Sequence, residues 1–174
     1  MIAGFTDSIG MNPFLIDAFK FSKLSERLEG ETPVAEMPRV AEVAQDKQGV
    51  IAWSLQGGQH RLGYPQLTLK VAGAITLLCQ RCLTPMRVDI DSASVLVLAR
   101  DEARADEIEA QLEDDEIDVI PVPEELNLRD LVEDEALLSL PFAPKHEVCP
   151  DQPEAAEPAK SEKPSPFAVL KNLK

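Results

Sequence analysis

Several features that mark common classes of protein are scarce or missing in this sequence of 174 residues. Aromatic residues make up only 5% of it, so side chains on which nucleic acid bases stack are few. No apolar run approaches the roughly 20 residues of a membrane span. The start of the sequence has no basic segment followed by an apolar one, as a secretory signal peptide would. We therefore expect a cytoplasmic protein that does not contact a membrane.

Motifs that carry catalysis are also missing. The sequence contains no G-x-G-x-x-G, no Walker motif, no H-E-x-x-H and no G-x-S-x-G. It has only two histidines, and no nucleophile can be paired with a general base. The clustered carboxylates are too numerous and too hydrated to form a tuned acid–base pair. We therefore expect a protein that is not an enzyme and has no small-molecule substrate.

The clearest local pattern is a pair of alternating segments around two cysteines. Residues 67–78 and 86–91 alternate between apolar and polar side chains, which is typical of half-buried strands, and the second segment continues into the apolar run Val95-Leu96-Val97-Leu98. The short segment Cys79-Gln-Arg-Cys82-Leu-Thr-Pro85 joins them, so we predict an antiparallel hairpin with the cysteines at its tip. Two side chains three residues apart on a straight strand point to opposite faces, whereas on a turn they can converge.

The remaining elements follow from periodicity and capping signals. Helical spacing predicts helices at 18–29 and 128–140, a further helix begun by Thr32-Pro33, and a weak one within 101–116. A strand at 38–44 and disorder at the highly charged 101–116 are the alternatives. Asn127 is the expected N-cap of the 128–140 helix. Strands are predicted at 12–16, 48–55 and 117–121, with Gly57-Gly58 as a turn.

This order of elements predicts the α+β class, with an antiparallel sheet, N-terminal helices and one strong helix in the C-terminal half. The sequence offers no strand–helix–strand alternation that would indicate a parallel sheet. The predicted parts are a loose leader at 1–11, a single domain at 12–149 with an acidic excursion at 101–118, and a flexible segment at 150–174.

The C-terminal segment combines a linker with a short apolar motif. Five prolines lie between residues 150 and 166, which is a linker composition. Phe167, Leu170 and Leu173 follow at intervals of three, and residues 160–174 hold four lysines and one acid. These properties predict a peptide that docks on a partner. Two alternatives are a frayed terminus and a tail that folds back on the acidic surface of the protein itself.

Negative charge is concentrated in one part of the chain. The net charge is −14, and residues 101–135 carry all of it, with sixteen acids and two bases. A concentration of negative charge attracts basic partners. The alternative is that these acids only keep the surface hydrated and bind nothing. The candidate partner-binding residues are Asp114, Asp115, Glu116, Glu133, Asp134 and Glu135, together with Phe167, Leu170 and Leu173.

Basic residues are fewer, and they lie around the predicted hairpin. If the sheet is antiparallel, some of them could form a small patch that contacts RNA; scattered hydrated side chains are the alternative. The candidate RNA contacts are Arg61, Lys70, Arg81 and Arg87.

Two pairs of residues have the spacing of zinc ligands. Cys79 and Cys82 form one pair, and His146 and Cys149 form the other. A structural zinc ion takes four such ligands, provided that the end of the 128–140 helix reaches the hairpin tip. The alternative is that the three cysteines are buried thiols that pack as small apolar side chains. An odd number of cysteines does not make a disulfide framework, which indicates a reducing compartment. A thiol-redox role is a further alternative, although thioredoxin-type pairs head a helix and this pair lies between strands.

Four segments occur in a characteristic order: Cys79-Gln-Arg-Cys82-Leu, then Leu131-Val-Glu-Asp-Glu-Ala-Leu-Leu-Ser-Leu-Pro141, then Pro144-Lys-His146 leading to Cys149, and finally Pro164-Ser-Pro-Phe-Ala-Val-Leu170. Together they resemble the bacterial YceD family, the large ribosomal RNA subunit accumulation proteins, from about Phe14 onward. The resemblance implies a cytoplasmic, non-enzymatic factor that supports 23S ribosomal RNA accumulation and therefore assembly of the large subunit. It implies no catalytic residues.

Charge limits how such a factor could act. A protein of net charge −14 is repelled by phosphates, so we expect ribosomal RNA to be affected indirectly. Our hypothesis is an acidic adaptor that binds a basic ribosomal protein or assembly factor. The alternatives are direct RNA binding through the basic residues, and a thiol-redox or metal-sensing protein that uses the C-x-x-C pair.

Overall fold

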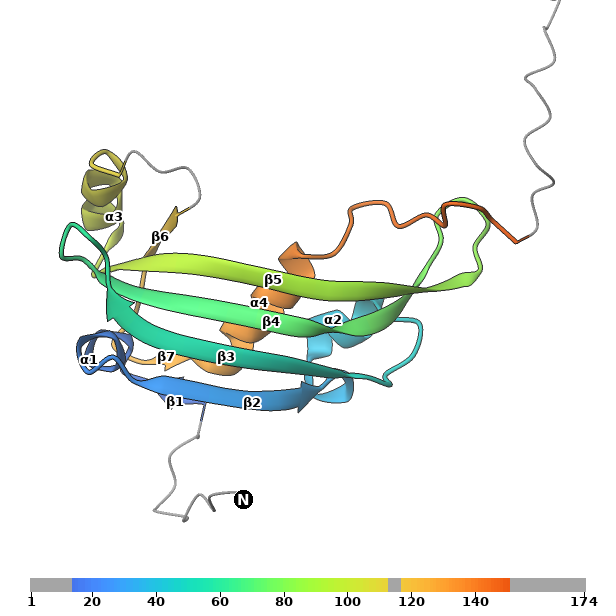
Figure 1. Ribbon diagram of the computed structural model, residues 1–174, viewed down its shortest axis with the longest axis horizontal. Helices are drawn as coiled ribbons and strands as arrows, with labels where there is room; N and C mark the ends of the chain where they lie inside the picture. Colours follow the sequence, from blue (N-terminus) through green and yellow to red (C-terminus); the bar gives the residue numbers. More distant parts are fainter. Residues whose placement is uncertain (1–13, 113–116, 151–174) are drawn as a thin grey trace, which may run out of the picture.

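The computed structural model describes residues 14–112 and 117–150. A twisted five-stranded sheet dominates it, with helices packed on one face and one further helix packed on the other face, at one end of the sheet (Figure 1). The strand order is β2-β3-β4-β5-β6. The strands are β2 (Arg27–Pro33), β3 (Val50–Gln59), β4 (Pro65–Leu78), β5 (Pro85–Ala99) and β6 (Ile117–Pro121).

The described helices lie before β3 and after β5. They are α1 (Ala18–Lys23), the short 3₁₀ turn η1 (Val34–Glu36), α2 (Pro38–Val43), α3 (Glu102–Glu109) and α4 (Leu128–Leu138). Two short strands, β1 (Leu15–Ile16) and β7 (Leu126–Asn127), pair with each other outside the main sheet. This architecture confirms the predicted α+β class. In the described part of the chain, no helix is both long and apolar enough to cross a membrane.

The core lies between the sheet and the two helices α2 and α4. Alternate residues of β4 are fully buried, among them Leu67, Leu69 and Val71, and they belong to one apolar cluster with Val132 and Ala136 of α4. Figure 1 shows α4 lying behind the central strands, with α2 next to it. The opposite face packs against α3 where β5 meets β6. Its middle is open to solvent, with exposed side chains such as Lys70 and Asp91.

The β4–β5 hairpin is the longest feature of the sheet. Its register runs without a break from Gln66 opposite Val97 to Leu78 opposite Pro85. The loop between the strands, residues 79–84, contains both cysteines of the C-x-x-C pair. The predicted position of this pair at a hairpin tip is therefore confirmed.

One strand pair differs from the prediction. β6 pairs with β5 in the parallel direction, and α3 connects the two strands, so a strand–helix–strand unit is present after all. Ala105 and Ile108 of α3 are buried against Val97 and Ala99 of β5. Ala105 and Ile108 are the two buried residues of α3, and most of its other side chains are charged. The apolar period of this helix is therefore weak in the sequence.

The predicted helix at 18–29 is wrong in its second half. α1 ends at Lys23, and Ser25 adopts a positive φ of 52° that reverses the chain. The following residues form β2, and their backbone pairs with β3 from Arg27 opposite Gln56 onward. Pairing in the sheet thus overrides a helical period that was carried largely by Leu24 and Leu28.

Two further local predictions differ from the structure for a related reason. Thr32-Pro33 ends β2, and the helical segment after it is divided into the 3₁₀ turn η1, which starts at Val34, and α2, which starts at Pro38. Gly57 and Gly58 lie inside β3, not in a turn. A Cβ atom on Gly57 would lie only 2.4 Å from the carbonyl oxygen of Phe21, so this glycine lets α1 pack tightly on the strand.

The helix predicted at 128–140 is confirmed, with slightly earlier termination. α4 runs from Leu128 to Leu138, and the Asn127 side chain caps it by accepting a hydrogen bond of 3.1 Å from the Arg129 N–H. The predicted leader, the acids Asp114, Asp115 and Glu116, and the segment 151–174 with Phe167, Leu170 and Leu173 lie outside the described residues. Predictions about them stay predictions.

Candidate metal centre

The four residues with zinc-ligand spacing come together at one end of the sheet. Cys79 and Cys82 come from the β4–β5 loop, and His146 and Cys149 come from the segment after α4. The ligand atoms of all four lie within 4.8 Å of one another. The condition set by the sequence, that the end of the last helix reaches the hairpin tip, is therefore met.

Backbone hydrogen bonds shape the loop so that its two cysteines face the same way. The Cys79 N–H donates to the Thr84 carbonyl at 3.0 Å, and the Leu83 N–H donates to the Cys79 carbonyl at 2.9 Å. Leu83 adopts a left-handed conformation with a φ of 59°, which completes the reversal. The Gln80 N–H donates to the Pro144 carbonyl at 2.8 Å and ties the loop to the segment after α4.

Two distances within the cluster match those of a tetrahedral zinc site. Two thiolates bound to one tetrahedral zinc ion lie about 3.8 Å apart, and a thiolate and an imidazole nitrogen lie about 3.5 Å apart. The Cys79 and Cys149 Sγ atoms are 3.8 Å apart, and Cys82 Sγ is 3.4 Å from His146 Nδ1. All three cysteines are free thiols. With four protein ligands, the set is closed in the manner of structural zinc sites, which leave no position for a substrate.

Hydrogen bonds favour the thiolate form of the cysteines in the loop. Burial opposes ionisation of Cys79, but the backbone N–H groups of Cys82, His146 and Arg81 outweigh it and lower the Cys79 pKa to about 5. The hydroxyl group of Thr84 lies 3.1 Å from Cys82 Sγ and lowers the pKa of that thiol. Zinc binds the thiolate form, so these contacts prepare the loop for a metal ion.

Arg81 holds the second segment against the loop. Its Nε donates to Cys149 Sγ at 2.9 Å, and its Nη2 donates to the backbone carbonyl groups of His146 and Glu147 at 2.6 and 3.2 Å. Burial raises the pKa of the Cys149 thiol, and Arg81 opposes that effect. Three thiolates and one imidazole around Zn²⁺ carry a net charge of −1, which the guanidinium group offsets. The sequence analysis missed this role, although the position of Arg81 between the two cysteines was a signal for it.

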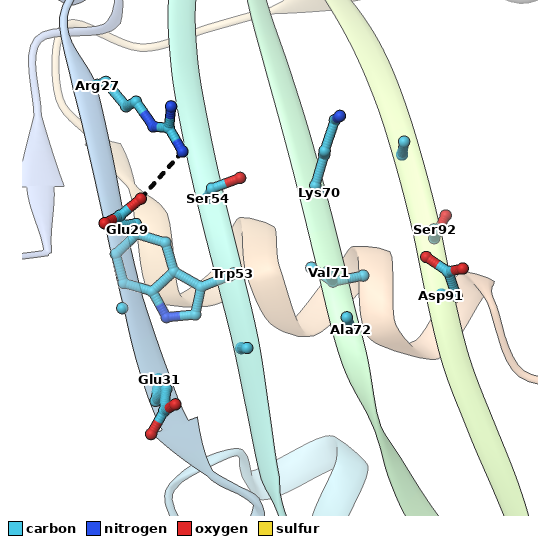
Figure 2. A pocket seen from close by; sticks show the side chains of 13 residues that line it. Arg27, Glu29, Glu31, Trp53, Ser54, Lys70, Val71, Ala72, Asp91 and Ser92 are labelled. Carbon is cyan, nitrogen blue, oxygen red and sulfur yellow. Dashed lines mark hydrogen bonds and ion pairs between the residues drawn. The ribbon is translucent and has the colours of Figure 1, made fainter.

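The other three candidate RNA contacts do not join Arg81 in a patch. Arg61 lies in the β3–β4 turn, at the far end of the fourteen-residue strand β4, roughly 45 Å away along the strand. Lys70 projects from the middle of β4 on the open face of the sheet (Figure 2). Arg87 pairs with Asp89 at 2.9 Å. Of the two interpretations of these residues, the structure agrees with scattered side chains rather than one patch, because an antiparallel sheet this long separates them.

The Glu133 carboxylate is buried and binds groups of the protein itself. Its side chain is only 3% exposed. Oε1 accepts hydrogen bonds from the backbone N–H groups of Arg39 and Val40 at 2.6 and 3.0 Å, and Oε2 pairs with Arg39 Nε at 3.2 Å. The carboxylate thus caps the first turn of α2, to which Met37, its N-cap residue, contributes no side-chain hydrogen bond. The prediction that Glu133 binds a partner on the surface is wrong.

Glu135 is also directed inward, whereas Asp134 is not. Glu135 is 8% exposed and accepts hydrogen bonds from the hydroxyl groups of Ser92 and of Ser94, the latter at 2.7 Å. Asp134 is 52% exposed and pairs with Arg39. The acidic triplet therefore offers one exposed carboxylate, because its outer members satisfy polar groups of α2 and β5.

The described acidic surface lies instead on α3 and next to it. Its exposed carboxylates are those of Asp101, Glu102, Asp106, Glu107, Glu109 and Asp118. The one arginine of α3, Arg104, pairs with Glu107 at 2.6 Å. The end of the sheet where β6 lies thus carries dense negative charge.

Comparison with known proteins agrees with the resemblance in the sequence. A family model described as "Large ribosomal RNA subunit accumulation protein YceD" matches residues 67–174. The match includes the β4–β5 hairpin, α3, α4 and all four residues of the candidate metal centre. No solved structure was found to match the chain. The chain belongs to the YceD family, whose description assigns it a role in accumulation of large-subunit ribosomal RNA.

Proposed function

We propose that this chain is a cytoplasmic, non-enzymatic factor that supports 23S ribosomal RNA accumulation by binding a basic protein. The partner would be a protein of the large subunit or one of its assembly factors. The family description supports the role in ribosomal RNA accumulation. The mode of action is inferred from the distribution of charge on the described surface.

The observation that carries this proposal is the contrast between the acids and the bases. The exposed acids on α3 form one surface, with Glu102 and Asp106 at its centre. The four candidate RNA contacts are spread over the sheet, and Arg81 and Arg87 already bind groups of the protein itself. A concentrated negative field attracts a basic protein and repels phosphates, so a protein partner fits better than direct contact with RNA.

We further propose that the Cys79, Cys82, His146 and Cys149 cluster holds a structural zinc ion. The ion would clamp the segment after α4 onto the tip of the β4–β5 hairpin. A redox role fits less well, because a reversible C-x-x-C disulfide needs access to both thiols, and Cys79 is buried while Cys82 is partly exposed.

The test is capture of partners by full-length tagged protein from nuclease-treated lysate. The test variant is Glu102→Gln with Asp106→Asn on α3. The control is Glu31→Gln with Asp91→Asn, which removes the same charge from exposed positions on the open face of the sheet. We expect the α3 variant to lose basic large-subunit proteins at least fivefold and the control to keep them.

Two results would contradict the adaptor proposal. If every captured protein is lost when the lysate is treated with nuclease, contact runs through RNA. If both double variants capture the same basic proteins as the unchanged chain, the α3 surface is only a hydrated face. In cells that lack the factor, the α3 variant should also fail to restore 23S ribosomal RNA, while the control restores it.

A further inference from the structure

An apolar groove runs along the side of α4 and is formed by two adjoining hollows. One hollow, of about 620 Å³, lies between α4 and β6, where Leu96, Val119 and Ile120 line it. The other, of about 560 Å³, lies between α4 and the end of β4, where Leu77, Leu78 and Phe142 line it. Leu137 and Leu138 line both, so the hollows lie next to each other on the two sides of these residues, and we treat them together as the groove.

Large apolar side chains stand exposed along this groove. Leu138 is 82% exposed, and Phe142 is fully exposed at 106%. Val43, across the second hollow, is also exposed. A contiguous apolar surface of this kind usually marks the binding site of another segment.

The rim of the groove is charged at one end only. The hollow next to β6 is bordered by the carboxylates of Glu109, Asp118 and Asp134. The polar residues that line the hollow next to β4 are Gln45 and Gln80, which are neutral. A matching ligand is therefore apolar along its length and basic at the end that lies near β6.

The described chain ends beside the neutral end of the groove. Cys149, one residue before that end, lies 3.8 Å from Cys79 in the metal centre. The neighbours of Cys79 in sequence, Leu78 and Gln80, line the second hollow. The segment that follows Pro150 therefore starts next to the groove.

We propose that residues 164–174 of the same chain bind in this groove. The segment supplies three large apolar side chains at intervals of three residues, Phe167, Leu170 and Leu173. Residues 160–174 hold four lysines against one acid, which complements the acidic rim. The groove borders the acidic surface proposed above to bind a basic partner, since Glu109 and Asp118 belong to both. The tests of the two proposals use different residues: Glu102 and Asp106 for the partner, and Leu170, Lys171 and Lys174 for the tail.

The connecting residues are long enough for this arrangement. Residues 151–163 span about 20 Å on average as a flexible linker, and at most about 45 Å when extended. A tether of this length keeps the segment at an effective concentration on the order of millimolar. Weak contacts are therefore sufficient to fill the groove.

The direction of the chain fixes how the segment lies. Phe167 is nearest the linker and occupies the hollow next to β4, while Leu170 and Leu173 occupy the hollow next to β6. Lys171 and Lys174 then lie at the acidic rim. Covering the groove in this way removes the apolar surface of α4 from water, which stabilises the bound state by burial of apolar area.

Photo-crosslinking in the full-length protein tests the proposal. We would replace Phe142 by p-benzoylphenylalanine, irradiate, and identify the crosslinked peptides by mass spectrometry. A mixture of ¹⁴N and ¹⁵N protein separates crosslinks within one chain from those between two copies. We expect crosslinks to residues 164–174 within one chain, with a yield that falls at least fivefold in Leu170→Asp and in the pair Lys171→Glu with Lys174→Glu.

The matched control carries the same crosslinker at Leu83, which is 69% exposed in the loop beside the metal centre. This position reports proximity of the linker without contact to the groove. Equal crosslinking of residues 164–174 from positions 83 and 142 would overturn the proposal, as would crosslinks between copies only or none at all.

Methyl NMR of the full chain gives a second readout. If the segment binds, Leu170→Asp shifts the methyl resonances of Leu137 and Leu138 in the groove and leaves those of Leu67 and Leu69 in the core unchanged. Unchanged groove resonances would contradict binding even if some crosslinking is observed.

Discussion

The Cys/His cluster and the acids 133–135 are two groups of residues that were predicted from the sequence to form binding sites. The structure brings the first group together and separates the second. Cys79, Cys82, His146 and Cys149 converge on one point. The acids 133–135 diverge, with Glu133 capping α2 and Glu135 binding two serines of β5. Neighbours on a helix project about 100° apart, whereas residues three apart in a tight turn can face one ligand. A run of acidic residues is therefore a weaker predictor of a binding site than two residue pairs at the spacing of zinc ligands.

Removal of a candidate zinc ligand should have the largest effect. We expect Cys79→Ser to reduce bound zinc from one per chain to near zero and to destabilise the fold by more than about 3 kcal/mol, because metal binding adds directly to folding free energy. Metal analysis and urea denaturation measure the two effects. Chelation of the unchanged chain should reproduce the loss of stability. If the thiols are only buried apolar groups, chelation will have no effect.

Truncation of Glu133, the buried acid of α4 that caps α2, should have the second-largest effect on stability. We expect Glu133→Ala to cost about 2–3 kcal/mol, because it leaves the N–H groups at the start of α2 unpaired and removes one of the two carboxylates that pair with Arg39. Urea denaturation of the full chain measures this cost, with Glu36→Ala as a control at an exposed acid. A cost equal to that of the control would mean that Glu133 behaves as a surface acid, as the sequence analysis assumed.

Arg81 was a candidate RNA contact, but in the structure it contacts the candidate metal centre. We expect Arg81→Ala to weaken zinc affinity about tenfold, since residues that position metal ligands typically have effects of this size. Competition with a zinc-binding dye measures the affinity. Arg87→Ala is the matched control, and it should leave zinc affinity unchanged. Loss of RNA binding in Arg81→Ala with normal zinc affinity would instead support direct contact with RNA.

The smallest effect is expected at the middle acid. Asp134 is half exposed and pairs with Arg39 at the surface, so Asp134→Asn should change stability by about 0.5 kcal/mol or less. Urea denaturation alongside Glu133→Ala gives the contrast within one triplet. Similar losses for the two variants would show that inward and outward acids are not energetically distinct.

The sequence was sufficient where local chemistry determines structure. The alternation in 67–78 and 86–91 and the loop between these segments predicted the hairpin, and Asn127 predicted the start of α4. It was insufficient where distant partners decide. Leu24 and Leu28 follow a helical period, but pairing with β3 converts Arg27–Pro33 into a strand. The acids of α4 gave no sign that Arg39 and Ser94 would bind them, because those partners lie about 40 or more residues away in sequence.

The metal content of the intact protein tests the central structural claim most directly. X-ray absorption of the full-length chain, purified without added metal, reports both the stoichiometry and the ligands. The account predicts one zinc ion per chain, bound by three sulfur atoms at about 2.3 Å and one nitrogen atom at about 2.0 Å. A folded, stable protein that contains no zinc and binds none when it is supplied would contradict it.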